Sequence, residues 1–375
     1  MTVVAVVFWA AVGLLVYTHL GYPLALAALT RLRGHPPAAP APAEAPSVSL
    51  IVAAHDEQEV IEAKVANALA LDYPRERLEL IVASDGSADR TAELARAAGA
   101  DLVLDLERAG KVGAQNAAAE RASGTVLAFS DANATWDVGA LRELVAALGD
   151  ERVGYACGRV RFIDAGGTNQ EGVYWRYELA VRGLESRLGG VTGGNGAIYA
   201  VRREAYIALG PASSHDLSFP FMLSKRGWRA VYAPLALAEE KLVPTVEGEF
   251  ARKRRMMRGL FDEVVRDGML SPRGYRPLYA FQIASHRLVR YLSPALHVIA
   301  LLANLFLLGE GALYVVTLAA QLGLLAAAAL APALPLRPLL LARYYVLVTA
   351  SIAAGLWDRI RLGTPGAWEK AAGTR

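Results

Sequence analysis

Apolar residues are unevenly distributed along this chain of 375 residues. Residues 3–30 carry no charged side chain other than a protonated His19, and about 20 apolar residues suffice to cross a bilayer. The first basic residues, Arg31 and Arg33, follow this stretch, whereas a secretory signal peptide carries its basic residues before the apolar run. The pattern predicts a retained transmembrane anchor at residues 1–30, with the N-terminus outside and the following residues in the cytoplasm.

A second apolar region covers residues 291–357, and glycine and proline divide it into segments. Two of these segments, Pro294–Leu308 with its flanks and Ala312–Ala331, are predicted to be spans. Arg343 interrupts Leu339–Trp357, which is either a third span or a re-entrant or interfacial helix. The basic tail after it would lie outside with three spans and inside with two, so the positive-inside rule opposes a third span without excluding it.

Between these apolar regions, short β-branched runs alternate with segments of helical periodicity. This alternation predicts an α/β domain with a mainly parallel, right-handed sheet. The expected strands are Val48–Ala53, Leu78–Ser84, Leu102–Leu104 and Thr125–Ser130, and the expected helices include Val60–Leu71 and Val138–Leu148.

The sequence predicts six segments, in which a Pro/Ala-rich linker separates the N-terminal anchor from the α/β domain. They are an anchor at 1–30, the linker at 31–46, the α/β domain at 47–245, basic amphipathic interface helices at 246–290, a membrane cluster at 291–357 and a basic tail at 358–375.

The composition agrees with a membrane-bound protein. Apolar residues make up 54% of the chain and charged residues 20%, against about 25% charged in soluble domains, and the mean hydropathy is +0.29. Cys157 is the only cysteine, so no intramolecular disulfide forms. A net charge of +3 is too small to indicate nucleic-acid binding by itself.

Polar residues follow three of the predicted strands, where ligands of such sheets bind. They are His55-Asp56-Glu57, Asp85-Gly86-Ser87 and Asp131-Ala132-Asn133. In the third group, two oxygen ligands two residues apart can face one hard cation. The other two have structural alternatives, because Asp56 with Glu59 fits a helix capping box and Asp85-Gly86 is a common turn dipeptide. The lack of a P-loop motif disfavours a nucleoside triphosphatase.

Seven segments, taken in order, resemble the family 2 glycosyltransferases, whose catalytic domain has the GT-A fold. They are VSLIVAAHDEQEVI, LDYPRERLELIVASDGSADRT, GKVGAQNAA, VLAFSDANA, GGNGAIYAVRREAY, SSHDLSFPFMLSKRGWRAVYAP and EFARKRRMMRG, which cover about Val48 to Leu260. The two apolar regions and the closing Trp368-Glu369-Lys370 resemble the membrane-bound branch of the family. The resemblance implies an inverting hexosyltransferase of the inner membrane. Its donor would be a nucleotide sugar, with a UDP-sugar expected, and its acceptor a lipid-linked glycan or growing polysaccharide.

The same resemblance implies roles for individual residues on the donor side. Asp56, Glu57 and Asp85 would hold the base and ribose of the nucleotide. Asp131 and Asn133 would hold Mg²⁺ or Mn²⁺ on the diphosphate, although Asn133 replaces a second carboxylate of the family pattern. Lys111 would add a point charge to the phosphates.

On the acceptor side, Asp216 aligns with the catalytic base, and an inverting transfer needs such a carboxylate to take the proton of the attacking hydroxyl. Gly194 and Asn195 are expected to line the acceptor site, with an ordinary tight turn as the alternative. The alternative for Asp216 is a helix N-cap. His215, beside it, is expected to be a local hydrogen-bond partner rather than a metal ligand.

The basic segment Arg252–Arg276 contains eight basic and three acidic residues, an excess of +5 that would attract anionic headgroups. Arg252 and Arg255 are assigned to substrate binding, because Arg255 matches the arginine of the Q-x-x-R-W motif of processive relatives. Arg252 and Met256 replace its glutamine and tryptophan, which weakens the case for chain extension. A merely solvated basic face is the alternative, and RNA binding is disfavoured because no aromatic residue lies within Arg252–Arg258.

Two hypotheses from other classes remain beside the enzyme. A non-catalytic nucleotide-sugar-binding membrane subunit that regulates a partner enzyme is compatible with Asn133 and with the altered Q-x-x-R-W region. A transporter is disfavoured, because only Arg343 and His297 place ionisable groups inside the predicted spans.

Overall fold

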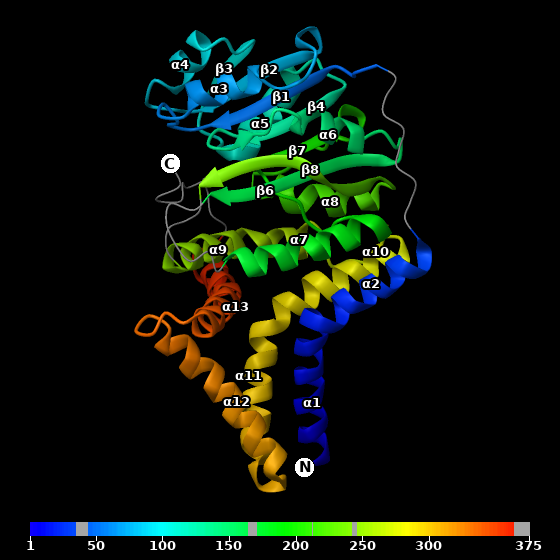
Figure 1. Ribbon diagram of the computed structural model, residues 1–375, viewed down its shortest axis with the longest axis vertical. Helices are drawn as coiled ribbons and strands as arrows, with labels where there is room; N and C mark the ends of the chain where they lie inside the picture. Colours follow the sequence, from blue (N-terminus) through cyan, green and yellow to red (C-terminus); the bar gives the residue numbers. More distant parts are fainter. Residues whose placement is uncertain (35–43, 164–170, 212, 242–245, 364–375) are drawn as a thin grey trace.

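A computed structural model describes residues 1–34, 44–163, 171–211, 213–241 and 246–363 of the chain. Its centre is an eight-stranded sheet of order β3-β2-β1-β4-β7-β6-β8-β5 (Figure 1). The strands are β1 Val48–Ala54, β2 Leu78–Asp85, β3 Leu102–Leu106, β4 Val126–Asp131, β5 Thr135–Trp136, β6 Val153–Ile163, β7 Ile198–Arg202 and β8 Arg229–Lys241.

The half of the sheet that begins the domain is parallel, with β1 between β2 and β4 and with β3 outside β2. β7 then runs antiparallel to both β4 and β6, while β6 and β8 are parallel to each other. The predicted α/β class is therefore confirmed, and the sheet is mixed rather than wholly parallel.

Alternate residues of the buried strands build two cores, one on each face of the sheet. In β1, Leu50 and Val52 pack into the core that includes α3 and α6. Ile51, between them, packs into the core that includes α5 and α8. The helices of this domain are α3 Ile61–Leu69, α4 Thr91–Ala97, α5 Gly110–Arg121, α6 Ala140–Ala147 and α8 His215–Lys225.

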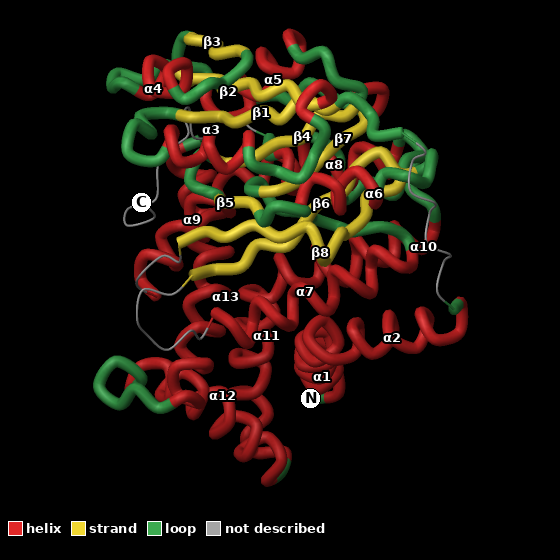
Figure 2. Tube along the Cα trace, turned by 45° about the horizontal axis from the view of Figure 1, so that its top comes forward, coloured by secondary structure: helices red, strands yellow, loops and turns green. Residues whose placement is uncertain are grey.

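The remaining helices lie below the sheet and lead away from it (Figure 1). They are α1 Thr2–Val16, α2 Tyr22–Arg33, α7 Glu171–Leu188, α9 Val246–Phe261, α10 Pro277–Gln282, α11 Val289–Leu307, α12 Ala312–Leu330 and α13 Arg337–Leu362. Within the described residues, four apolar helical stretches are long enough to cross a membrane, and they cover Thr2–Arg33, Pro277–Glu310, Ala312–Leu330 and Arg337–Leu362. α7 packs against β8 and α2, and α9 packs against α13, as both views show (Figure 2).

Two of the apolar helices contain π-helical segments, which often mark bends. One is Tyr17–Gly21, between α1 and α2, and the other is Ile283–Leu288, between α10 and α11. The hydroxyl groups of Tyr17 and Ser285 are 2.7 Å apart, so the two helices are joined at the level of these segments. α1 and α11 pack along each other, whereas α2 and α10 extend beneath the α/β domain (Figure 1).

α13 continues unbroken through Arg343, which forms an ion pair with Glu247 of α9. Figure 1 shows α13 almost end-on, while α1 and α11 run lengthwise, so α13 lies across their direction. Near its other end, Asp358 pairs with Arg254 at 2.6 Å. α13 thus lies along α9 with polar contacts at both ends. The domain boundaries predicted from the sequence stay predictions.

Candidate active site

The carboxyl ends of β1, β2 and β4 lie next to one another at one edge of the sheet. Ala54 of β1 is in register with Ser84 of β2, and Ala53 of β1 is in register with Asp131 of β4. The three polar loops that follow these strands therefore share one edge, where ligands of such sheets bind. The roles of their individual residues stay predictions.

The loop after β1 is held against the loop after β2. Asp56 has φ +48°, and it is the one described non-glycine residue with a positive φ. Its carboxylate accepts a hydrogen bond from the N–H of Ala88 at 2.8 Å, and its own N–H donates to Ser87 at 3.1 Å. The capping-box alternative for Asp56 is wrong, because α3 begins after Val60 and no side chain caps it. Glu57, the next residue, is only 2% exposed.

Asp85 is buried, and it organises the start of α5. Its carboxylate accepts hydrogen bonds from the backbone N–H groups of Ala109 at 2.7 Å and Gly110 at 3.0 Å. Arg108 adds a guanidinium nitrogen 3.4 Å from the same carboxylate. These contacts fix the first turn of the helix that carries Lys111, so Asp85 positions Lys111 as well as facing the edge of the sheet.

Lys111 and Asp131 form an ion pair at this edge. Burial lowers the pKa of Lys111, but the attraction of Asp131 outweighs it, and the pKa is raised overall. A Cβ on Gly196 would lie 3.0 Å from the Lys111 ammonium nitrogen, so only a glycine fits here without a shift. Asn133 follows Asp131 by two residues, and no three His, Cys, Asp or Glu side chains within the described residues could hold a metal by themselves.

The segment from Gly193 to Gly196, ahead of β7, joins this edge to α8. Gly194 donates its N–H to the carbonyl oxygen of Asp216 at 2.6 Å. The Asn195 amide donates to the carbonyl oxygen of Gly158 at 2.7 Å and accepts from the N–H of Ile198 at 2.9 Å. Its side chain therefore holds the turn, and its assignment to substrate binding stays a prediction.

Asp216 occupies the first turn of α8, whose N-cap is Ser214. The helix-cap alternative for Asp216 is therefore wrong, because the residue lies inside the helix rather than at the capping position. Its side chain is partly exposed and makes no hydrogen bond or ion pair with any residue that the structure describes. A partly exposed carboxylate without a partner is available to take a proton.

Buried groups around Asp216 fix the start of α8. Glu263 accepts hydrogen bonds from Ser214 and Ser218, both at 2.7 Å. Burial raises the pKa of Glu263 to about 8, against the two serine hydrogen bonds, and the charge of Asp216 adds to the rise. Nδ1 of His215 lies 2.5 Å from the Tyr199 hydroxyl, so His215 is the local hydrogen-bond partner expected. Burial and the nearby lysine lower the pKa of His215 to about 3, which keeps the ring neutral.

Neither Glu240 nor Glu263 is among the site residues predicted from the sequence. Glu240 lies near the end of β8, and burial together with the charge of Asp131 raises its pKa to about 7, against the attraction of Lys111 and Arg252. Glu240 therefore belongs to the same electrostatic environment as the edge residues. Glu239 and Glu240 end the apolar alternation of β8. Because acidic residues at strand ends also mark the three polar loops, this pair was a signal in the sequence that could have identified Glu240.

Most of the basic side chains of α9 contact partners within the chain. In α9, Glu249 binds Arg252 at 2.7 Å and Lys253 at 2.9 Å. Arg258 donates to the carbonyl oxygens at the end of α13. Arg255 is partly buried in the same helix. Four of the five basic side chains of α9 thus have partners within the chain, which leaves them less available to lipid headgroups.

Comparison with known proteins places this geometry in context. Residues 49–210 match the family model described as Glycosyl transferase family 2. Poly-beta-1,6-N-acetyl-D-glucosamine synthase of Staphylococcus aureus (strain COL) is 26% identical over 249 residues, 63% of this chain and 60% of the synthase. The probable glycosyltransferase YdaM of Bacillus subtilis (strain 168) is 27% identical over 237 residues, 58% of this chain and 56% of YdaM. The chain thus spans less than two thirds of the length of these curated relatives.

A solved structure resembles nearly the whole chain. It is a mannosyltransferase from Pyrobaculum calidifontis in complex with GDP-Man and Mn²⁺, with 25% sequence identity and a TM-score of 0.73. The match covers 94% of this chain and 99% of the mannosyltransferase. The shared fold therefore includes the apolar helices as well as the GT-A sheet.

Proposed function

The chain carries a domain of glycosyl transferase family 2 with the GT-A fold, and on this premise we propose that it is a membrane-bound, inverting glycosyltransferase. It would move a sugar from a nucleotide-sugar donor to a lipid-linked glycan or a growing polysaccharide. One observation supports the proposal: the segment from Gly193 to Gly196 adjoins both the residue that we propose as the base and the lysine that we propose for the phosphates. Gly194 binds the backbone of Asp216, and Gly196 abuts Lys111.

On the donor side, the residues present fit a magnesium or manganese ion bound together with a diphosphate. Asp131 and Asn133 offer a carboxylate and an amide oxygen, and Mg²⁺ is usually held by one or two carboxylates plus substrate phosphates. When bound, the ion stabilises the negative charge of the departing diphosphate. Lys111 adds a positive charge fixed by its ion pair with Asp131.

On the acceptor side, Asp216 would act as general base. Its carboxylate takes the proton of the acceptor hydroxyl, whose oxygen forms a bond to the anomeric carbon on the face opposite the diphosphate. The bond from the anomeric carbon to the diphosphate oxygen breaks, and the diphosphate leaves with the electron pair. One displacement of this kind inverts the configuration of the sugar.

The donor that we propose first is a UDP-sugar. GDP-mannose is the second candidate, because the mannosyltransferase that matches 94% of the chain was solved with GDP-Man and Mn²⁺. The synthase relative makes a polymer of N-acetylglucosamine, as its name states, but the shared region covers only 60% of it.

The membrane arrangement that we propose has an external N-terminus and a cytoplasmic α/β domain, in the inner membrane. α1, α11 and α12 would cross the bilayer, while α13 would lie at its cytoplasmic surface against α9. Three crossings from an external N-terminus leave the basic residues at the end of α13 inside, in keeping with the positive-inside rule. The ion pairs of Arg343 with Glu247 and of Asp358 with Arg254 support an interfacial α13.

The proposal is tested with the full-length protein purified in detergent. UDP-glucose, UDP-galactose, UDP-N-acetylglucosamine and GDP-mannose are each supplied with Mg²⁺ or Mn²⁺, and products are identified by mass spectrometry. One of these donors should be consumed, and only with the metal. Full activity after chelation and dialysis would remove the metal from the proposal. Donor binding without turnover over a broad acceptor panel would favour the regulatory subunit instead.

A further inference from the structure

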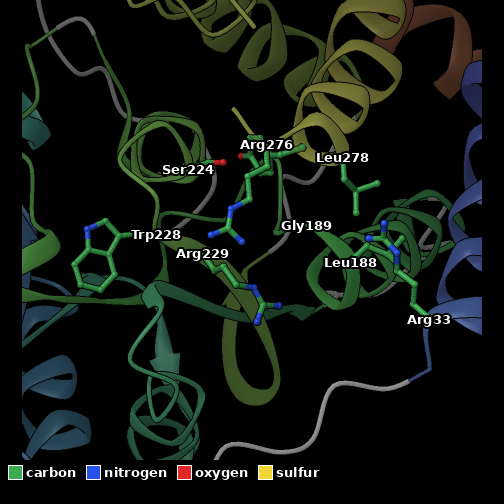
Figure 3. A pocket seen from close by; sticks show the side chains of 9 residues that line it. Arg33, Leu188, Gly189, Ser224, Trp228, Arg229, Arg276 and Leu278 are labelled. Carbon is green, nitrogen blue, oxygen red and sulfur yellow. The ribbon is translucent and has the colours of Figure 1, made fainter. Parts of the chain in front are cut away.

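Three arginine residues surround a hollow of about 150 Å³ on the side of the α/β domain nearest the apolar helices (Figure 3). Arg33 is the last residue of α2, Arg276 directly precedes α10, and Arg229 begins β8. Among the described residues, no acidic side chain lines this hollow. A cavity of this volume has room for a molecule the size of benzene, and therefore for a phosphate group.

Two of the three guanidinium groups around the hollow have no acidic partner in the described part of the chain. Arg229 donates to the carbonyl oxygen of Ser186 at 3.1 Å and lies 3.6 Å from the carboxylate of Asp150. The guanidinium groups of Arg33 and Arg276 make no hydrogen bond or ion pair with any residue that the structure describes. Two guanidinium groups are thus available, and guanidinium groups bind phosphate through paired N–H donors.

The exposed face of α2 indicates where the bilayer surface lies. Tyr22 and Leu26 are buried against α7, in a cluster with Val181. On the opposite face, Leu24 is 69% exposed and Leu32 is 84% exposed. A helix with one face packed on the protein and an apolar face open is suited to lie on lipid. Arg33 lies at the end of α2 on the side that carries Tyr22 and Leu26, so the hollow lies between α2 and the α/β domain, at the depth of the headgroups when the open face of α2 rests on lipid.

We propose that this hollow binds the phosphate of an anionic membrane lipid. The site is separate from the reaction centre, because Ser224, which lines the hollow, follows Asp216 by eight residues on α8, about 12 Å along the helix. It goes beyond the proposed function, since it needs neither donor nor metal. It also differs from the headgroup attraction expected of the basic segment, whose α9 charges are largely met within the chain.

The test uses full-length protein in detergent and the thermal unfolding midpoint as readout, with short-chain phosphatidylglycerol as the anionic probe. A ligand that binds the folded state raises this midpoint in a concentration-dependent way. The pocket variant is Arg33→Gln/Arg276→Gln. Its matched control is Arg31→Gln/Arg273→Gln, which removes the same charge from exposed positions two and three residues away, outside the hollow. Short-chain phosphatidylcholine and inorganic phosphate are run in parallel.

The site predicts that phosphatidylglycerol stabilises the wild type and the control, while the pocket variant needs at least about tenfold more lipid for the same shift. Phosphatidylcholine should have no such effect. Equal shifts in all three proteins would overturn the site in favour of general charge attraction. An equal shift with inorganic phosphate would overturn the lipid as the source of the phosphate. Without lipid, the pocket and control variants should unfold at similar temperatures. If the pocket variant is unstable, Arg276→Lys replaces it: this variant keeps the charge and should retain part of the shift caused by phosphatidylglycerol. No outcome depends on sugar transfer.

Discussion

Replacing Gly194 with alanine tests whether the segment before β7 positions the base. A Cβ at Gly194 would lie 2.0 Å from the hydroxyl oxygen of Tyr155 and 3.2 Å from Cβ of Cys157. Tyr155 is fully buried, with its ring stacked on Tyr199, so the glycine segment has to shift instead of the ring. Reaching a distance of 3.0 Å requires a shift of about 1 Å, and the hydrogen bond from Gly194 transmits this shift to Asp216. A misplacement of 1 Å at a reacting group costs about 10²-fold in rate.

The assay compares kcat and donor affinity in Gly194→Ala with those in Gly183→Ala, a control in α7 where nothing lies within 4 Å of the added Cβ. We expect kcat to fall about 100-fold in the first variant and to stay near wild type in the second. Tyr155→Phe removes the obstructing oxygen and leaves a ring carbon at 3.0 Å, so the double variant should regain much of the rate. A near wild-type kcat for Gly194→Ala, or a double variant no better than the single, would refute this reasoning.

Three further predictions concern pH, the metal and the α9–α13 contact. Because the pKa of Glu263 rises from 4.5 to about 8 on burial, its stabilising contribution is fully present below pH 4.5 and is lost as the pH rises to 8. Glu263→Gln should therefore flatten the dependence of the unfolding midpoint on pH across this window, and a profile parallel to wild type would contradict the assignment. Asp131→Ala, which also removes the partner of Lys111, should weaken Mn²⁺-dependent donor binding at least tenfold in calorimetry, and unchanged binding would exclude the metal role. Arg254→Gln breaks a forked ion pair with Asp358 and should give faster hydrogen exchange in α13, whereas unchanged exchange would show that the pair does not hold this helix.

The first half of the α/β domain was readable from the sequence because its strands are buried on both faces. A continuous apolar run such as Val48–Ala53, bounded by turn residues, leaves few alternatives, and β1 covers Val48–Ala54. The polar residues after these strands could be placed at one edge for the same reason, since parallel neighbours end together.

The second half depends on contacts between residues far apart in the chain. Glu263 follows Ser214 by 49 residues, and nothing local in the basic segment indicates that it accepts hydrogen bonds from the serine hydroxyls at the start of α8. The side-chain partner of Asp56 was also hidden, because a positive φ turns this residue towards Ala88 and away from α3. Arg343 and Glu247 form an ion pair although they are 96 residues apart in the chain. From the sequence, Arg343 could therefore be interpreted only as a charge that interrupts a membrane span.

The central claim is that Asp216 takes the proton of the acceptor while other residues bind the donor. Asp216→Asn keeps the shape of the side chain but removes its capacity to accept a proton. The transfer rate of this variant and its donor affinity, measured in the same preparation, separate the two roles. The account predicts a rate lower by about 10²–10⁴-fold with donor affinity unchanged. Transfer at a near wild-type rate by Asp216→Asn would contradict it.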